Sequence, residues 1–272
     1  MPQHFAIAIL SYNHPDITAK CVRSVLNLHN KNQVYLTHNG SLPQHIHKLK
    51  EEFPDIQHIE IQNNKGYTHG VNTTLSVVFQ KFHQVLFLTN DTELIQINPY
   101  PKEGFHSIEI RKRKSNTIDS IMGALNPQKG SLRHLKNRDD LTQKELCYVP
   151  GTAFWMSKNV FDQVGFFDEN FHTYWEDVDY SLRAQKLNFK IESDSQTICM
   201  HKIGKTCHKD RFYTFELFQR NRGLCLRKNN LLSIPFYFYY IKDLIKFSKS
   251  DYKLGISVFL KHIRDSYDKK ST

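Results

Sequence analysis

The feature that most constrains the fold is the alternation of short apolar runs with amphipathic segments over the first 90 residues. Four apolar runs have the length of strands and lie at residues 4–11, 33–37, 56–61 and 84–88. Three segments between them carry apolar residues at helical spacing and lie at residues 16–29, where Asp16 is the expected N-cap, at 43–53, and from about 71 onward. Strands and helices that alternate with short links predict a parallel sheet with right-handed crossovers.

Polar and glycine residues follow the predicted strands at their carboxyl ends, where open α/β sheets bind their ligands. These residues are Ser11, Tyr12 and Asn13, then His38 and Asn39, then Lys65, Gly66, Gly70 and Asn72, and finally Asn90 and Asp91. Glycines before a helix let backbone N–H groups approach a phosphate, although many such turns are only loops. A carboxylate at the tip of a buried strand, here Asp91, is a usual ligand of a divalent cation; the alternative is a turn or helix cap.

The middle of the chain is less regular. Residues 99–116 are predicted to be irregular and basic, residues 117–125 a strand, and residues 126–146 a polar surface excursion. The core resumes at 147–156, and a short helix capped by Ser157 follows. Beyond it we expect a helix at 180–187 and two strands at 189–193 and 196–202, the second of which carries His201 near its end.

A dense group of acids stands in residues 150–183, where Glu176, Asp177 and Asp179 follow aromatic residues that include Tyr174 and Trp175. Carboxylates beside aromatic bulk are costly to bury unless they pair, bind metal or transfer protons. This stretch is therefore the first candidate for catalysis. Arg183, four residues after Asp179, is a candidate ion-pair partner for that carboxylate within a helix.

The last fifth of the chain is basic. Residues 219–272 hold 12 Lys and Arg against 4 Asp and Glu, so they carry +8 of the net charge of +10. Predicted helices at 211–229, 231–247 and 255–267 mix Phe, Tyr, Leu and Ile with Lys and Arg. Two interpretations stay open: the helices lie in an anionic membrane interface, or they pack against the rest of the chain or against a second copy in a homodimer.

Composition narrows the class of protein. A hydrophobic content of 39% supports a sizeable core and argues against global disorder. The 5 cysteines form no CxxC pair, which fits reduced thiols in the cytoplasm. No apolar run reaches about 18 residues, and the N-terminus lacks a signal-peptide pattern. The prediction is a cytoplasmic protein, with peripheral attachment to the inner face of the cell membrane left open.

Several of these segments, in this order, resemble the family 2 glycosyltransferases of the GT-A fold. The matching segments run from Phe5 to Asn229 and are AILSYN, HNGS, NNKGYTHGVN, LFLTNDT, the 34-residue block PGTAFWMSKNVFDQVGFFDENFHTYWEDVDYSLR, His201 and QRNR. Within the family, the chain looks like the rhamnosyltransferase-like enzymes of bacterial O-antigen and capsule synthesis. The resemblance implies an α/β catalytic domain at residues 1–210, Rossmann-like with a mostly parallel central sheet flanked by helices, and a helical extension at 211–272.

The same resemblance implies an activity, namely transfer of a sugar, with inversion, from a nucleotide-diphosphate donor to a hydroxyl of a glycan or lipid-linked acceptor. Asp177 would be the general base, and Glu176 would bind the acceptor or orient the base. The strand-end residues given above would bind the nucleotide-sugar, and Arg220 the diphosphate. The acceptor would meet Gly151, Thr152, Trp175 and Glu176. Asp91 and His201 would hold Mn²⁺ or Mg²⁺, and Mn²⁺ accepts a His ligand more readily.

Two positions depart from the family pattern. His38 stands where the family usually has an Asp that holds the nucleotide base, and Thr89-Asn90-Asp91 keeps only the last acid of the DxD metal motif. These departures leave open a glycosyltransferase-like binding or scaffold module without activity. A zinc site at Cys199, His201, Cys207 and His208 and a nucleic-acid-binding protein are weaker alternatives. The zinc spacing fits no common pattern, and no nucleic-acid-binding motif is present.

Overall fold

The structure is a computed structural model that describes residues 5–201 and 211–248. In this part of the chain, the first four strands are β1 (Phe5–Ser11), β2 (Val34–Asn39), β3 (Gln57–Ile61) and β4 (Gln84–Thr89). They pair in parallel in the order β3-β2-β1-β4. Helices α1 (Pro15–Leu26), α2 (Pro43–Glu52) and α3 (Tyr67–Val78) connect them. The predicted alternation of strands and helices is confirmed, and so are the four strands within a few residues.

The sheet continues beyond β4 with a mixture of directions. The added strands are β5 (Thr92–Gln96), β6 (Phe105–Lys112), β7 (Ile118–Ser120), β11 (Ala153–Ser157) and β12 (Ile191–His201). The order continues as β4-β11-β6-β12-β5, and β7 pairs with β6. Of these pairings only β6 with β12 is parallel. The α/β class is therefore confirmed, with a sheet whose first half is parallel and whose second half is mixed.

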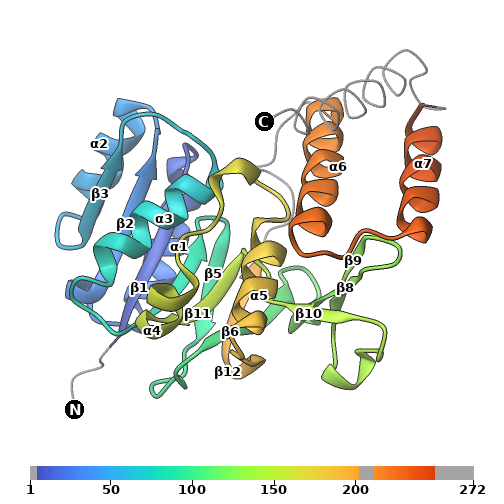
Figure 1. Ribbon diagram of the computed structural model, residues 1–272. Coiled ribbons are helices and arrows are strands. Elements are labelled where there is room, and N and C mark those ends of the chain that lie inside the picture. The colour runs from blue at the N-terminus through green and yellow to red at the C-terminus, as the bar shows by residue number, and fades with distance from the viewer. Residues whose placement is uncertain (1–4, 202–210, 249–272) are drawn as a thin grey trace.

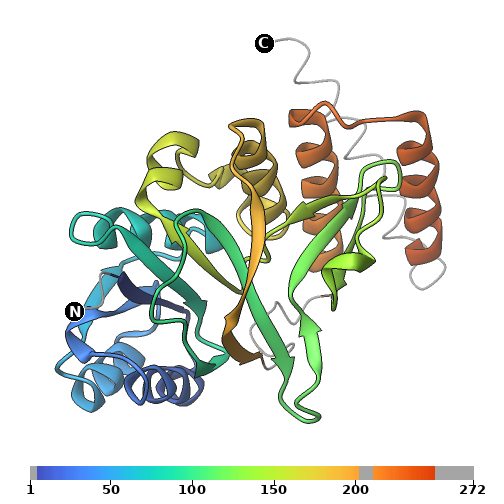
Figure 2. The same ribbon diagram turned by 90° about the horizontal axis from the view of Figure 1, so that it is seen from below.

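A smaller sheet and two helices form the other end of the molecule. Strands β8 (Met122–Asn126), β9 (Ser131–Leu135) and β10 (Leu146–Tyr148) form this antiparallel sheet in the order β10-β8-β9. Helices α6 (Arg211–Lys228) and α7 (Ile234–Ser248) lie beside it in both views (Figures 1 and 2). Leu125, Tyr148, Leu226 and Phe236 belong to one buried cluster that joins the small sheet to both helices. None of the described helices is both long and apolar enough to cross a bilayer.

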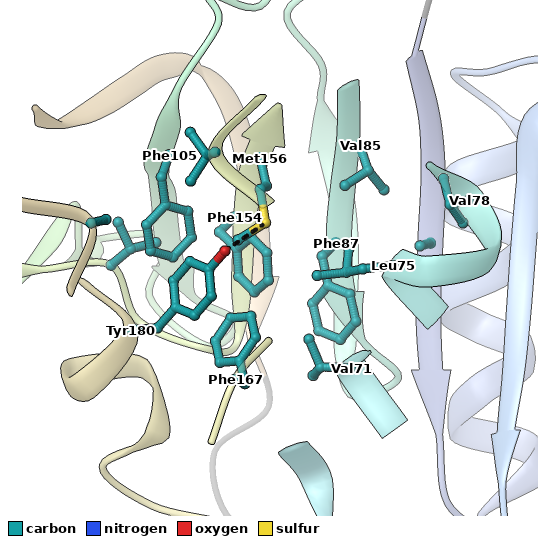
Figure 3. Packing of buried hydrophobic residues seen from close by; sticks show 14 of the residues in the cluster. Val71, Leu75, Val78, Val85, Phe87, Phe105, Phe154, Met156, Phe167 and Tyr180 are labelled. Carbon is teal, nitrogen blue, oxygen red and sulfur yellow. Dashed lines mark hydrogen bonds between the residues drawn. The ribbon is translucent and has the colours of Figure 1, made fainter. Parts of the chain in front are cut away.

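The core has a layer on each face of the central sheet. Alternate residues of β1 enter different layers: Ala6 and Ala8 face α3, whereas Ile7 and Ile9 face α1. On the α3 side, aromatic rings from β4, β6, β11, α5 (Glu176–Lys186) and the loop after α4 (Lys158–Val164) pack together (Figure 3). The Tyr180 ring stacks on Phe167, with 4.0 Å between ring centroids. Tyr180 belongs to α5, so this stacking fixes the helix that carries the acidic group.

Several boundaries differ from the predictions. Helix α1 is preceded by His14 in a left-handed conformation and begins at Pro15, so Asp16 is not its cap; Asp16 pairs with Lys48 instead. Helix α3 begins at Tyr67 rather than near Val71, and α5 begins at Glu176 rather than Tyr180. The N-cap of α4 (Lys158–Val164) is Ser157 as predicted, but its hydroxyl accepts a hydrogen bond from the Gly104 N–H and does not cap the helix.

Two segments predicted to be irregular are sheet. Residues 99–116 contain β6, and residues 126–146 contain β9 and the beginning of β10. Conversely, the two strands expected at 189–193 and 196–202 are one strand, β12, with a break in register between Asp194 and Ile198. Pairing with strands that are distant in the sequence determines where these strands form and end. The periodicity of the sequence does not reveal that pairing. The helix predicted at 255–267 lies outside the described residues.

Candidate active site

The first turn of α5 presents two neighbouring carboxylates at the middle of the molecule (Figure 1). One oxygen of Asp177 accepts a hydrogen bond from the Gly151 N–H at 2.9 Å, and the other accepts one from the Val178 N–H at 2.8 Å. Glu176 is 6% exposed, and among the described residues its Oε2 has no hydrogen-bond partner. The two side chains therefore differ in how well each supports a negative charge.

This difference separates the two acids chemically. Burial, and then the charge of Asp177, raises the pKa of Glu176 well above its usual value. Burial also raises the pKa of Asp177, but the hydrogen bonds from Gly151 and Val178 oppose that rise. Asp177 thus ionises first, and Glu176 holds its proton more strongly. One carboxylate beside one carboxylic acid is a pair suited to base and hydrogen-bond donor, respectively.

A two-residue turn joins Asp177 to the tip of β4. Gly151 binds Asp177 through its N–H, and the next residue, Thr152, accepts hydrogen bonds at its carbonyl from the N–H and hydroxyl of Thr89, at 2.9 and 3.2 Å. The same Thr89 hydroxyl donates to Oδ1 of Asp91 at 2.7 Å. A side chain on Gly151 would meet the hydroxyl of Tyr67 at 3.0 Å, so this turn has no room for one. The acids at 91 and 177 are thereby linked through one turn.

The pair predicted to bind metal is brought together. Nε2 of His201, at the end of β12, lies 3.3 Å from Oδ2 of Asp91, although the two residues are far apart in the sequence. Both side chains are largely buried. A carboxylate and an imidazole suit Mn²⁺. The described residues contain no group of three or more His, Cys, Asp or Glu side chains placed to hold a metal ion. Two protein ligands would thus leave the other coordination positions to donor and water.

The tip of β2 holds a relay of two histidines. Nε2 of His58 lies 3.0 Å from the carbonyl oxygen of Phe53, which can only accept, so this nitrogen carries the proton. Nδ1 of His58 then accepts from Nε2 of His38 at 2.9 Å. Burial lowers the pKa of His38 to about 4 and also lowers that of His58, so both rings are neutral. Nδ1 of His38 is therefore a buried acceptor, and among the described residues it has no partner.

Some residues predicted to bind the donor are occupied by structural contacts. Both groups of the Asn72 carboxamide bond the backbone of Phe167. Gly70 lies inside α3, and a side chain there would meet Leu10 at 2.8 Å, so its glycine serves helix–sheet packing. Ser11 and Asn90 both bond the Thr18 hydroxyl.

The other residues predicted to bind the nucleotide-sugar donor differ in their exposure and in their hydrogen bonds. The side-chain oxygen of Asn13 accepts from the Leu42 N–H. Gly66 precedes α3 with a φ of 105°, a conformation that favours glycine. Tyr12 and Lys65 are exposed. Oδ1 of Asn39, like Nδ1 of His38, is a buried acceptor without a partner among the described residues. The β2 tip thus offers two acceptors.

On the acceptor side, Trp175 is 1% exposed, and its ring packs against Phe218 with 5.5 Å between ring centroids. Trp175 therefore has almost no exposed surface to offer the predicted acceptor. Tyr174 is only partly buried. Nη1 of Arg220 donates to the carbonyl of Asn170 at 2.9 Å, which places this residue beside the loop before α5. Cys207 and His208 of the zinc alternative lie outside the described residues.

The sequence prediction missed three residues that complete the site. Tyr67 donates to the Gly151 carbonyl. His58 fixes the protonation of His38. Asn221 bonds the loop before the acids. Tyr67 lies within the NNKGYTHGVN segment and Asn221 within the QRNR segment, but the predictions drew on other residues of both segments; no such segment contains His58. The predicted pairing of Asp179 with Arg183 is confirmed at 2.9 Å.

A sequence model described as "Glycosyl transferase family 2" matches residues 6–96, which span β1 to β5. Among curated proteins, the chain is 24% identical over 193 residues to the low-salt glycan biosynthesis hexosyltransferase Agl10 of Haloferax volcanii. That match covers 66% of the chain and 62% of Agl10, so the chain spans about three fifths of its relative.

Solved structures show the fold. The mannosyltransferase PcManGT from Pyrobaculum calidifontis, in complex with GDP-Man and Mn²⁺, matches with a TM-score of 0.55 and 10% identity, over 92% of this chain and 76% of that one. GalNAc-T7 with UDP, GalNAc and Mn²⁺ matches with a TM-score of 0.61 and 14% identity, over 98% and 58%. S. aureus TarS 1–349 with UDP-GlcNAc matches with a TM-score of 0.54 and 13% identity, over 83% and 66%. The chain has the GT-A fold of these glycosyltransferase structures.

Proposed function

We propose that the chain is an inverting glycosyltransferase that moves a sugar from a nucleotide-diphosphate donor to a hydroxyl of a glycan or lipid-linked acceptor. The observation that carries the proposal is the chain of hydrogen bonds that links Asp177 to Asp91 through the Gly151–Thr152 turn and Thr89. Single displacement needs a base on the acceptor and charge neutralisation on the leaving group, and the two acids supply one side each. Bacterial O-antigen or capsule is the proposed product class.

Asp177 is the proposed base. An acceptor hydroxyl has a high pKa and needs a carboxylate within hydrogen-bond reach as it attacks the anomeric carbon, and such a base contributes roughly 10²–10⁴-fold to the rate. The hydrogen bonds from Gly151 and Val178 hold the Asp177 carboxylate in one orientation. Glu176 keeps its proton and donates to an acceptor oxygen. The proposed single displacement inverts the anomeric carbon and needs no enzyme nucleophile.

The donor would occupy the ends of β1, β2 and β4. Nδ1 of His38 and Oδ1 of Asn39 are acceptors, so they favour a nucleoside, with its N–H and hydroxyl donors, over phosphate at the β2 tip. Lys65 and Arg220 are the cations proposed to contact the diphosphate. Asp91 and His201 would hold the divalent cation, which as a Lewis acid would neutralise charge on the leaving diphosphate.

Nucleotide release from a panel of UDP-, GDP- and dTDP-sugars, with and without Mn²⁺, tests the proposal. We expect one donor to be turned over and Asp177→Asn to lower kcat by roughly 10²–10⁴-fold, because the amide cannot take the proton. Asp162→Asn, on the exposed face of α4, is the matched control and should leave kcat unchanged. Full activity in Asp177→Asn would overturn the assignment of Asp177 as the base. Absence of turnover together with tight donor binding would favour the scaffold alternative.

We also propose that residues 211–272 form a helical extension that contacts an anionic membrane surface. On α7, Ile234, Phe238, Ile241 and Ile245 form an exposed apolar stripe, whereas Phe236 and Leu244 on the same helix are buried. Helices with exposed aromatic and aliphatic residues beside lysines bind the interface between headgroups and acyl chains. The contact would bring a lipid-linked acceptor to the catalytic domain.

Flotation with vesicles of 30% anionic lipid tests this attachment. We expect Phe238→Ser/Ile241→Ser to lose binding, and Tyr100→Ser, which removes an exposed aromatic from the central-sheet end of the molecule, to retain it. Concentration-dependent dimerisation that the double variant abolishes, with no vesicle binding, would assign the stripe to a homodimer instead.

A further inference from the structure

The segment that leads into the catalytic acids has an unusual backbone. Between the short 3₁₀ helix Glu169–Phe171 and α5, three residues other than glycine have left-handed φ angles: His172 at 60°, Tyr174 at 68° and Trp175 at 73°. Each such residue costs about 1–2 kcal/mol. Residues 172–175, which we call the acid-bearing loop, therefore keep this conformation only because the surroundings hold it.

The surrounding contacts converge on the loop carbonyls. Five consecutive carbonyl oxygens, those of residues 170 to 174, each accept a hydrogen bond from α6 or α3. Arg220 bonds that of Asn170, and Thr68 bonds that of His172 through both its N–H and its hydroxyl. The remaining three all bond one side chain. Nδ2 of Asn221 lies 2.6, 2.7 and 2.9 Å from the carbonyls of Phe171, Thr173 and Tyr174.

The chemistry of position 221 follows from these contacts. Carbonyl oxygens only accept, so the group that faces all three must be the NH₂ end of the carboxamide. Its oxygen end accepts from Nη1 of Arg220 at 3.0 Å, which fixes the orientation. Asn221 is fully buried, so no water competes for these bonds. An aspartate would fill the same volume but would place an acceptor against three acceptors.

We infer that Asn221 is a positioning residue for the reaction: from α6 it holds the acid-bearing loop in its left-handed conformation, and so orients Glu176 and Asp177. This inference rests on the proposed role of Asp177. Asn221 bonds the loop and Nη1 of Arg220, the proposed diphosphate ligand, and Arg220 keeps its own bond to the Asn170 carbonyl. Removal of Asn221 should therefore affect the chemical step more than donor binding. Misplacement of a catalytic group by about 1 Å can cost roughly 10²-fold in rate.

The test compares Asn221→Asp and Asn221→Ser with a control, Asn159→Asp. The control makes the same Asn→Asp substitution on the exposed surface of α4. On the donor identified with the sugar-nucleotide panel, we expect both Asn221 variants to lower kcat by about 10–100-fold with donor KM changed less than about threefold. A loss that tracks only the fraction of unfolded protein, or a rise in KM with kcat unchanged, would overturn the inference. Should one variant not fold at 25 °C, the other decides.

A second readout needs no substrate. The chain has 2 Trp, and Trp175 lies in the acid-bearing loop, whereas Trp155 lies in the central sheet and donates to Thr197. Release of the loop should expose Trp175 and raise acrylamide quenching in the Asn221 variants only. Unchanged quenching with unchanged kcat, while Asp177→Asn is inactive, overturns the inference and leaves the proposed function standing. Raised quenching with an active Asp177→Asn overturns the base and keeps the loop contact.

Discussion

Two regions of the molecule hold their functional groups in different ways. We call the parallel strands β1 to β4 with α1 to α3 the donor half, after its proposed role, and α5 with the loop before it, the small sheet and α6 the acid half. In the donor half, the β1, β2 and β4 tips place side chains at the ends of regular parallel strands, and short links leave little freedom. In the acid half, Glu176 and Asp177 follow a loop with three left-handed residues, whose carbonyls bond side chains from segments about 50 and 100 residues away in the sequence. Regular structure fixes the first set, and individual long-range hydrogen bonds fix the second.

The difference suggests where the two halves are vulnerable. Parallel strands spread their stability over many backbone hydrogen bonds, so a single side chain contributes little to the placement of a tip. A loop held by a few buried polar groups depends on each of them. A buried polar group that loses its hydrogen-bond partner costs more free energy than an intact hydrogen bond contributes. Three predictions probe this contrast, from the largest expected effect to the smallest.

The largest effect is expected at Asp179, which is fully buried in the acid half. Its carboxylate bonds Arg183 at 2.9 Å, Lys228 at 3.1 Å and Asn229 at 3.2 Å, so it ties α5 to α6. Asp179→Ala should lower the free energy of unfolding by about 3–5 kcal/mol, because cations and an amide lose a buried partner. Urea unfolding measures the change. Asp16→Ala, which breaks an exposed ion pair with Lys48 in the donor half, should leave the midpoint nearly unchanged. Equal effects would contradict the contrast.

The second effect is a loss of stability in acid that originates in the donor half. Burial lowers the pKa of both His29 and His38 to about 4, below the 6.5 of an unfolded chain. Between these values the unfolded state binds more protons, so stability is full above pH 6.5 and falls as the pH drops toward 4. We expect each ring to contribute on the order of 1–3 kcal/mol to that loss.

His29→Phe isolates one of these contributions. The His29 ring stacks on Phe5 with 4.8 Å between centroids, so an aromatic ring of similar shape can keep this contact without titrating. Unfolding measured at pH 7.5 and 4.5 should show a smaller loss of stability in this variant than in the unchanged chain. An identical pH dependence would mean that His29 does not titrate as described.

The smallest effect is a gain in stability at Glu176. The pKa of this carboxyl is raised in the folded protein, so its contribution is full below the unfolded pKa and declines as the pH rises toward the folded one. Glu176→Gln removes that decline and should stabilise the protein by about 1 kcal/mol at pH 8 and by less at pH 4.5. Thermal unfolding at the two pH values measures it. A variant destabilised equally at both would show that the acid is held by contacts and does not carry a burial cost.

The sequence predicted the donor half well because its elements have local signals. Apolar runs and helical spacing locate β1 to β4 and α1 to α3, and the parallel order brings the strand ends together. The Asp91–His201 proximity is also consistent with strand ends meeting at one edge. The sequence does not distinguish donor binding by Asn72 and Gly70 from a role in packing, because the same residue types serve both. Only the contacts with Phe167 and Leu10 distinguish the two uses.

In the acid half, the sequence located the acids but not what holds them. Residues 126–146 contain few apolar residues and form strands because they pair with β8, which is a tertiary effect. Left-handed residues such as Tyr174 and Trp175 carry no composition signal, since these types rarely adopt that conformation. The burial of Trp175 against Phe218 depends on α6, about 40 residues later, and so it could not be anticipated from the aromatic run itself.

The Gly151–Thr152 turn links the part of the site that holds Asp177 to the part that holds Asp91. One of its residues bonds Asp177 and the next bonds Thr89, whose hydroxyl bonds Asp91, so two backbone units link the proposed acceptor side to the proposed leaving-group side. We expect the surrounding loops to vary in length and sequence, and with them the sugar and the acceptor, without a change in this link.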